Sequence, residues 1–83
     1  MQGALDSEIF MSLLGLKNGE SCFVEKIDEQ AECYERFLEL GFTHGETITV
    51  VRRAPFGGPI QVVVRGTSYA IGREDAKYIQ IMK

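Results

Sequence analysis

The chain has 83 residues, of which 45% are hydrophobic and 25% are charged, and its formal net charge is −3. A chain this short has room for a single hydrophobic core, so we expect one domain over residues 1–83. Nucleic acid is disfavoured as a ligand, because phosphate binding needs clustered cations and the nine Lys and Arg residues are dispersed.

The first ten residues lack the basic start and the apolar core of a signal peptide. Elsewhere no apolar run approaches the roughly 18 residues that a membrane-spanning helix needs. The sequence therefore predicts a cytoplasmic protein that touches a membrane only through a partner. Within residues 1–12 we expect an irregular arm or a short helical turn that begins at Asp6 or Ser7.

An internal repeat follows this segment. LGLKNGESCFVEK, from Leu14 to Lys26, aligns without gaps on LGFTHGETITVVR, from Leu40 to Arg52. In each copy a glycine near the turn can supply a positive φ, and Ser or Thr opens a strand. Two strands should therefore enter the same sheet through similar turns, because either one turn is used twice or the segment was duplicated. In the first strand Val24 and Ile27 are out of phase, which predicts a β-bulge.

Helical periodicity marks the stretch between the two copies. Tyr34, Phe37, Leu38 and Gly41 follow an i, i+3, i+4, i+7 pattern, with charged residues between them. Gly41 stands where a C-terminal glycine cap belongs, and Phe42 follows it as the accompanying hydrophobic contact. The pattern predicts a short helix that must dock on a sheet to be stable.

Alternation with a period of two predicts the remaining strands. Strict alternation places Arg52 on the same face as Ile48 and Val50. The side chains expected to face the core in these strands are Ile48, Val50, Ile60, Val62, Val64, Tyr69, Ile71, Ile79 and Ile81.

Turns separate these strands. Residues 54–59, with two prolines that flank two glycines, cannot continue a ladder. Gly66-Thr67 is expected to form a tight hairpin turn, and residues 73–76 a brief helical turn. A mainly β fold follows, with about five antiparallel strands and one short helix. So few strands hide their edges by curling, so we expect a small SH3-like barrel.

No constellation of residues indicates catalysis. Adjacent carboxylates occur at Asp28-Glu29 and Glu74-Asp75, but no nucleophile or base accompanies them. The glycine-rich segment 54–60 lacks the Lys-Ser/Thr pair of a P-loop. The sequence predicts a protein that is not an enzyme and that needs no cofactor.

Three soft ligands, Cys22, Cys33 and His44, leave a metal site open as an alternative. Their spacing does not demand such a site, and two thiols in the cytosol are more often reduced core residues. If they meet, the protein would be an Fe²⁺ or Zn²⁺ sensor or chaperone. A second alternative is weak self-association through an exposed strand edge.

Surface side chains offer the remaining candidates for function. Phe56 lies at the tip of the segment 54–59, where it either folds back onto the barrel or contacts a partner. Arg52 and Arg53 are either solvated or partner anchors. Tyr78 and Met82 alternate with the inward residues of the last strand, and their outer face is expected to be exposed.

The order of these features resembles the FeoA family of small cytosolic components of bacterial ferrous-iron transport. No single motif is specific, but together the motifs cover the chain from about Leu13 to Ile81. The matching residues are Gly19-Glu20, the junction 36–45, the A-P-x-G-x-P-I hairpin 54–60, the V-R-G at 64–66, and Arg73, Ala76 and Ile79. Two departures are Gly58, where an aspartate is usual, and His44, where a proline is common.

The resemblance implies an SH3-like barrel that works with FeoB, a ferrous iron permease that carries a cytosolic GTPase domain. The chain would then be an accessory or regulatory protein that binds the cytosolic part of that permease. A small contact should depend on a few aromatic and arginine anchors. The residues expected to form it are Leu40, Gly41, Phe42, Arg52, Arg53 and Phe56.

Overall fold

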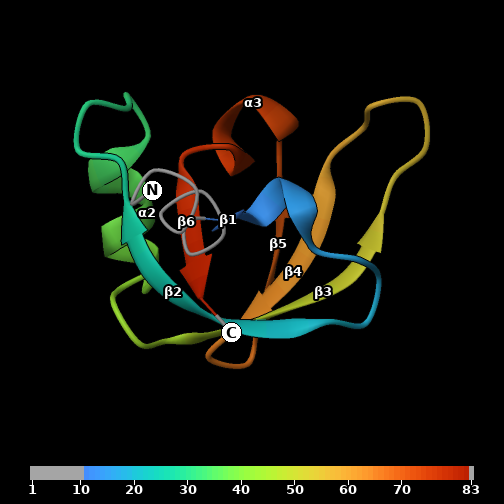
Figure 1. The fold of residues 1–83 in the computed structure, drawn as a ribbon, viewed down its shortest axis with the longest axis horizontal. Coiled ribbons are helices and arrows are strands. Elements are labelled where there is room, and N and C mark those ends of the chain that lie inside the picture. The colour runs from blue at the N-terminus through green and yellow to red at the C-terminus, as the bar shows by residue number, and fades with distance from the viewer. Residues whose placement is uncertain (1–10, 83) are drawn as a thin grey trace, which may run out of the picture.

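The computed structural model describes residues 11–82 (Figure 1). Of the segment 1–12, expected to be an irregular arm or a helical turn, residues 1–10 lie outside this range, and Met11–Ser12 form a short strand instead. Six strands form one antiparallel sheet in the order β1-β6-β2-β3-β4-β5, which curls around a single core. The mainly β, SH3-like class is confirmed, with one strand more than expected. The elements are β1 (Met11–Ser12), the 3-10 helix η1 (Leu13–Gly15), β2 (Ser21–Ile27), α2 (Tyr34–Leu40), β3 (Thr47–Arg53), β4 (Ile60–Val64), β5 (Thr67–Ile71), α3 (Arg73–Ala76) and β6 (Ile79–Met82).

The sequence repeat forms a reciprocal pair of hydrogen bonds between β2 and β3. The Gly19 N–H donates to the Val50 carbonyl at 2.7 Å. The Gly45 N–H donates to the Val24 carbonyl at 2.8 Å. Both glycines have positive φ, 85° and 86°, a conformation that residues with a Cβ resist. Two similar turns therefore lead into neighbouring strands of one sheet, as the repeat predicts.

Register shifts decide which side chains of β2 and β3 face the core. The bulge expected in β2 is confirmed, since its register with β6 shifts between Val24 and Lys26 and both Val24 and Ile27 are buried. A second shift, between Val50 and Arg52 in β3, is not foreseen by strict alternation. The expectation that Arg52 shares the inward face of Val50 is therefore wrong. The bulge turns Arg52 to solvent, which avoids burying a charge in an apolar core.

The helix α2 closes one end of the sheet (Figure 1). It ends at Gly41, which has φ 106° and whose N–H donates to the carbonyls of Phe37 and Leu38. Phe42 lies between Phe37 and Tyr69, with ring centroids 5.2 and 5.5 Å away. Full burial of such a ring contributes about 2–3 kcal/mol, so this junction anchors the helix that is too short to stand alone.

Among residues 11–82 every buried side chain is apolar or a cysteine.

The β4–β5 turn consists of Arg65 and Gly66, with φ 55° and 81°, and Thr67 already belongs to β5. The expected Gly66-Thr67 turn is therefore wrong by one residue, because a two-residue hairpin with right-handed strand twist favours positive φ at both central positions. No helix in the range 11–82 is long and apolar enough to cross a membrane.

Candidate interaction surface

The loop between β3 and β4 projects from the barrel (Figure 1). Its base is closed by the Ala54 N–H, which donates to the Pro59 carbonyl at 3.0 Å, and by the Gly58 N–H, which donates to the Pro55 carbonyl at 3.1 Å. A Cβ on Gly58 would lie 2.8 Å from the Ala54 Cβ. Gly58 therefore keeps the two arms of the loop close together, and an aspartate at this position would force them apart.

Phe56 occupies the tip of this loop and is fully exposed, with 103% of its reference area accessible. The alternative in which Phe56 folds back onto the barrel is therefore wrong. Its φ is 59°, and Gly57 follows at 75°. A bulky residue in this conformation costs about 1–2 kcal/mol, so the chain holds an unburied aromatic ring in a strained backbone. Such strain is concentrated at functional positions.

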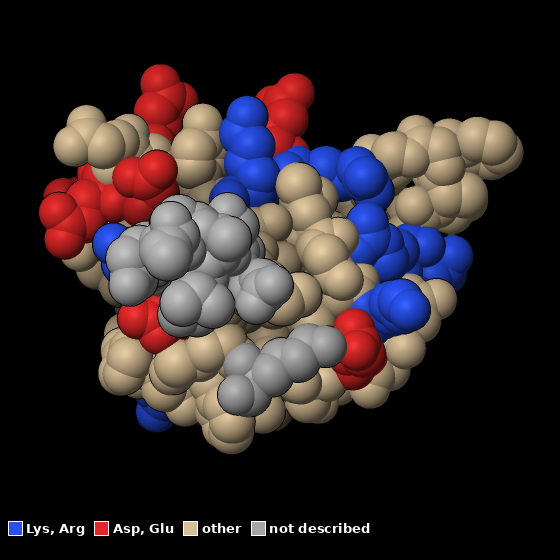
Figure 2. Space-filling model, in the orientation of Figure 1, with Lys and Arg blue, Asp and Glu red and all other residues tan. Residues whose placement is uncertain are grey.

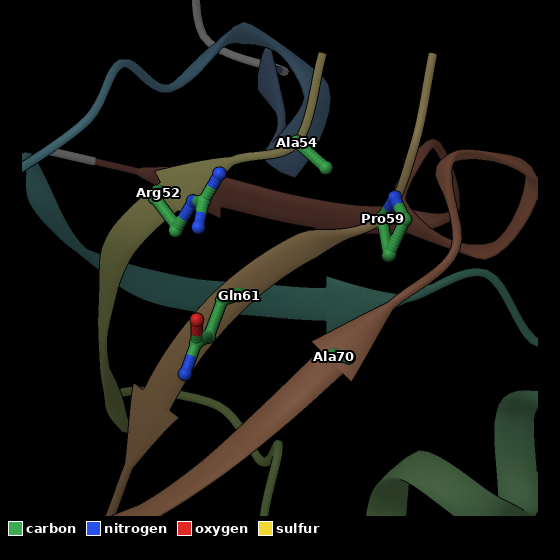
Figure 3. Close-up of a pocket in the computed structure, with 5 residues that line it drawn as sticks. All are labelled: Arg52, Ala54, Pro59, Gln61 and Ala70. Atoms are coloured by element: carbon green, nitrogen blue, oxygen red, sulfur yellow. The ribbon is translucent and has the colours of Figure 1, made fainter. Parts of the chain in front are cut away.

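A hollow of about 190 Å³ lies next to the base of the loop (Figure 3). Its residues come from β3, β4, β5 and the loop, and the pairing register places Arg52 opposite Gln61 and Gln61 opposite Ala70. Gln61 is oriented by a hydrogen bond from its Nε2 to the Ser68 Oγ at 3.0 Å. The Arg52 side chain has no hydrogen bond or ion pair with any residue in the range 11–82. We define the hairpin surface as Arg52, Ala54, Phe56, Pro59, Gln61 and Ala70.

Basic side chains lie close to the loop 54–59. In Figure 2, Lys and Arg gather below the projecting loop, whereas most Asp and Glu of this face gather at the opposite end. Arg73, at the start of α3, reaches the loop, since its Cδ lies 3.9 Å from the position of a Cβ on Gly57. The hairpin surface is therefore suited to an acidic rather than a basic partner.

Arg53 does not belong to this surface, contrary to the sequence-based expectation. Its guanidinium Nη1 donates to the carbonyls of Leu14 and Leu16, at 2.5 and 2.6 Å. Its backbone N–H donates to the Asn18 Oδ1 at 2.9 Å. The bulge in β3 turns this arginine toward η1, where it satisfies carbonyls that a one-turn helix leaves without partners.

The junction Leu40-Gly41-Phe42 offers little accessible surface to a partner. Phe42 has no exposed surface, Gly41 is buried, and Leu40 is half-buried. The Leu40 carbonyl accepts a hydrogen bond from the Tyr69 hydroxyl at 3.3 Å. The sequence-based expectation places these three residues in the partner contact, whereas in the structure they pack α2 against the barrel.

The structure does not bring the candidate metal ligands together. Cys22 lies inside β2 and Cys33 precedes α2, both buried and neither in a disulfide. His44 is exposed, with its Nδ1 2.8 Å from the Glu25 carbonyl oxygen. Within residues 11–82 no group of three or more His, Cys, Asp and Glu side chains is placed to hold a metal ion. Burial, and then the charge of Asp75, raises the pKa of the Cys33 thiol, which disfavours the thiolate that binds metals.

The exposed surface differs from the sequence-based expectation at two places, the last strand and the hollow beside Arg52. Tyr78 and Met82 are half-buried rather than exposed, and an exposed aromatic residue on the neighbouring strand β2 is Phe23, which pairs with Met82. No pattern in the sequence indicates that Gln61 and Ala70 belong to an interaction surface. Their position opposite Arg52 follows from the strand register, which a single sequence does not specify once a bulge intervenes.

Residues 11–83 match the FeoA domain family. The chain is 34% identical over 71 residues to the Fe(2+) transport protein A/Fe(2+) transporter FeoB fusion protein of Porphyromonas gingivalis, a match of 86% of this chain and 8% of that protein. It is 33% identical over 70 residues to a candidate Fe(2+) transport protein A of Methanocaldococcus jannaschii, a match of 75% of this chain and 83% of the relative.

Among solved structures, Stenotrophomonas maltophilia FeoA complexed with zinc, described as an SH3 domain protein, is similar in sequence as well as in fold. The two chains are 31% identical, the match covers 86% of this chain and 88% of the other, and the TM-score is 0.75. The family match covers nearly the whole described chain, the relatives agree with it in sequence and one of them also in fold, and the protein belongs to the FeoA domain family.

Proposed function

We propose that this protein is a non-enzymatic, cytoplasmic accessory component of ferrous iron uptake that binds the cytosolic, GTPase-bearing part of a FeoB-like permease. Membership of the FeoA domain family supports a role in ferrous iron transport. The Porphyromonas gingivalis relative supports the partner, because there transport protein A and FeoB are one fusion protein. Two activities joined in one chain act at the same place.

The hairpin surface is the proposed contact. The observation that carries this choice is the fully exposed Phe56, held at the tip of a narrow loop beside the unpaired guanidinium of Arg52. Aromatic and arginine side chains supply most of the affinity in small interfaces, provided that the surrounding residues exclude water. Arg53, Leu40, Gly41 and Phe42 are left out of this contact, since each is engaged within the fold.

Binding of the purified protein to the cytosolic region of its cognate permease tests the proposal. The titration is run with and without a GTP analogue and at two salt concentrations. Saturable binding that depends on the nucleotide would make the protein a regulator that responds to the state of the GTPase. Saturable binding without that dependence would make it a scaffold. No binding under any condition, with the domain shown to be folded, would contradict the proposed function.

Variants locate the contact within the same assay. Phe56→Ala and Arg52→Ala should each weaken binding by about tenfold or more. Phe23→Ala is the matched control, because Phe23 is also an exposed phenylalanine, at 45%, but lies on β2, outside the hairpin surface. It should change the affinity by less than about threefold. Equal effects of Phe56→Ala and Phe23→Ala would exclude the hairpin surface while leaving the function standing.

Metal binding is a second candidate, since Stenotrophomonas maltophilia FeoA was solved in complex with zinc. The described residues of this chain do not fit a three-ligand site, because Cys22 and Cys33 are buried in different elements and His44 faces solvent. Anaerobic calorimetry with Fe²⁺ and with Zn²⁺ decides the matter. Heat of binding that His44→Ala abolishes would favour this candidate, and its absence at high-micromolar metal would remove it.

A further inference from the structure

The strand β5 forms one edge of the sheet. It pairs with β4 over five residues without a register shift, and no other strand pairs with it. No backbone hydrogen bond joins residues 67–71 to any described residue beyond this ladder. Three of its five residues, Thr67, Ser68 and Ala70, are exposed. An accessible row of backbone donors and acceptors therefore runs along β5.

The turn that opens β5 decides which groups point outward. A two-residue turn places the residues that flank it, Val64 and Thr67, in a hydrogen-bonding pair. Because such pairs alternate with non-bonded pairs along an antiparallel ladder, the N–H and C=O groups of Ser68 and Ala70 face away from β4. Both side chains lie beside the hairpin surface, through the Gln61–Ser68 hydrogen bond and the hollow that Ala70 lines.

This edge lacks the devices by which proteins protect exposed strands. Edge strands are normally very short, or carry charges, proline or a bulge. The opposite edge, β1, has two residues. By contrast β5 reads T-S-Y-A-I, with no charge, no proline and no bulge. An unprotected edge of this length is suited to the addition of an extended segment from a partner.

Charged residues at the two ends of β5 restrict which segment can pair with this strand. Arg65 precedes β5 and Arg73 follows it, and neither side chain has an ion pair or hydrogen bond with the described residues 11–82. Of the acids that follow Arg73, Asp75 is already paired with Arg36 at 2.9 Å. If a second copy added its own β5 antiparallel, Arg65 of each copy would approach Arg73 of the other. Like charges placed opposite each other are destabilising, so self-pairing is disfavoured, and a segment with acids at both ends is favoured.

We propose that β5 accepts an extended segment of the permease's cytosolic part as an added strand, uncharged over its middle five residues and carrying Asp or Glu at both ends. This inference rests on the proposed function and extends the hairpin surface onto the adjacent edge. Backbone hydrogen bonds to Ser68 and Ala70 add to the affinity that Phe56 and Arg52 supply, and Arg65 and Arg73 select the register and exclude a second copy.

Residue-resolved amide hydrogen exchange tests this edge directly. In the protein alone, the amides of Ser68 and Ala70 should exchange at least about 100-fold faster than those of Tyr69 and Ile71, which face β4. Saturation with the permease's cytosolic region should slow Ser68 and Ala70 at least about tenfold. Saturable binding without this protection would overturn the inference and leave the proposed function intact. No binding at all would overturn both.

Two substitutions provide an independent arm. Ala70→Pro removes an outward N–H, and proline is tolerated on an edge strand where its nitrogen faces solvent. It should weaken binding at least about tenfold, with a melting temperature within about 3 °C of the wild type. Ala70→Val keeps the N–H but also alters the hairpin surface, so it should weaken binding at least about threefold less than Ala70→Pro, and equal losses from the two variants would overturn the inference.

Arg73→Glu tests the selection by charge. It should weaken binding to the permease region and also make the protein dimerise at high concentration, because the introduced carboxylate of one copy would meet Arg65 of the other. Sedimentation of the unmodified protein should give a single 9.3 kDa species. Dimerisation of the unmodified protein that Ala70→Pro abolishes would overturn the inference in favour of self-pairing.

Discussion

Arg53 and Leu16 lie 37 positions apart in the chain, yet the Arg53 Nη1 donates to the Leu16 carbonyl at 2.6 Å. The contact ties the end of β3 to the segment that follows η1, and a second bond from the same nitrogen reaches the Leu14 carbonyl. Arg52, the preceding residue, points to the solvent on the other side of the strand. Of these two adjacent arginines, Arg53 therefore stabilises the fold, whereas Arg52 is available for binding.

Removing the Arg53 side chain should lower stability. Arg53→Ala leaves two carbonyls without their charged donor, so the free energy of unfolding should fall by about 2 kcal/mol. Arg52→Ala is the matched control and should change it by less than about 0.5 kcal/mol. Urea denaturation of both variants measures the difference. Equal losses would show that the division of tasks between the two arginines is wrong.

The two repeat glycines should respond alike to substitution. A Cβ at Gly19 or Gly45 would meet no atom within 4 Å, so the cost of alanine is that of the positive φ alone. Gly19→Ala and Gly45→Ala should each lower the free energy of unfolding by about 1 kcal/mol. Gly72→Ala serves as the control, because Gly72 has φ −63° and also has open space around it. A loss at Gly72 as large as at Gly19 would contradict this account.

Replacing Phe56 should stabilise the free protein. Phe56 buries no surface and has a φ of 59°, whereas asparagine tolerates that conformation. Phe56→Asn should therefore raise the free energy of unfolding by about 0.5–1 kcal/mol. It should also weaken binding to the permease's cytosolic region. Phe23→Asn, on a regular strand, should lower stability. A loss of about 1 kcal/mol or more from Phe56→Asn, measured in urea, would mean that the ring packs against the barrel in solution.

Alkaline pH should destabilise the protein in part through Cys33. Burial and the charge of Asp75 raise the pKa of this thiol, so the folded state disfavours the thiolate more than the unfolded chain does. The neutral Cys33 thiol makes its full contribution to the free energy of unfolding below the pKa of the unfolded chain, roughly 8.5. This contribution is lost as the pH rises through the higher pKa of the folded state. The unfolding free energy of Cys33→Ala should fall less between about pH 7 and pH 10 than that of the wild type. Parallel pH profiles for the two proteins would refute this.

Local patterns in the sequence were sufficient for most elements. The helical period from Tyr34 onward, the stop at Gly41 and the phase error between Val24 and Ile27 each follow from neighbours a few residues apart. The repeat also predicted that two strands with glycine turns would meet, because identical turn chemistry imposes the same entry into a sheet. The fold class followed from these pieces.

The candidate site depended on information that is not local. A bulge in β3, invisible in a strictly alternating pattern, decided that Arg53 turns toward Leu14 and that Arg52 stays exposed. The exposure of Phe56 depends on whether the loop 54–59 reaches back to the barrel, which only the complete chain determines.

The sequence by itself determined most of the secondary structure, the single core and the family of this protein, because periodicity, turn residues and motif order are local properties of the chain. Only the tertiary structure decided which residues of the motifs remain accessible. The Leu40–Phe42 junction packs α2 against the barrel, and Cys22 and Cys33 are buried in different elements. The strand β5 remains an unpaired edge of the sheet. Burial and strand register arise from contacts between distant segments, so they appear only when those segments are brought together.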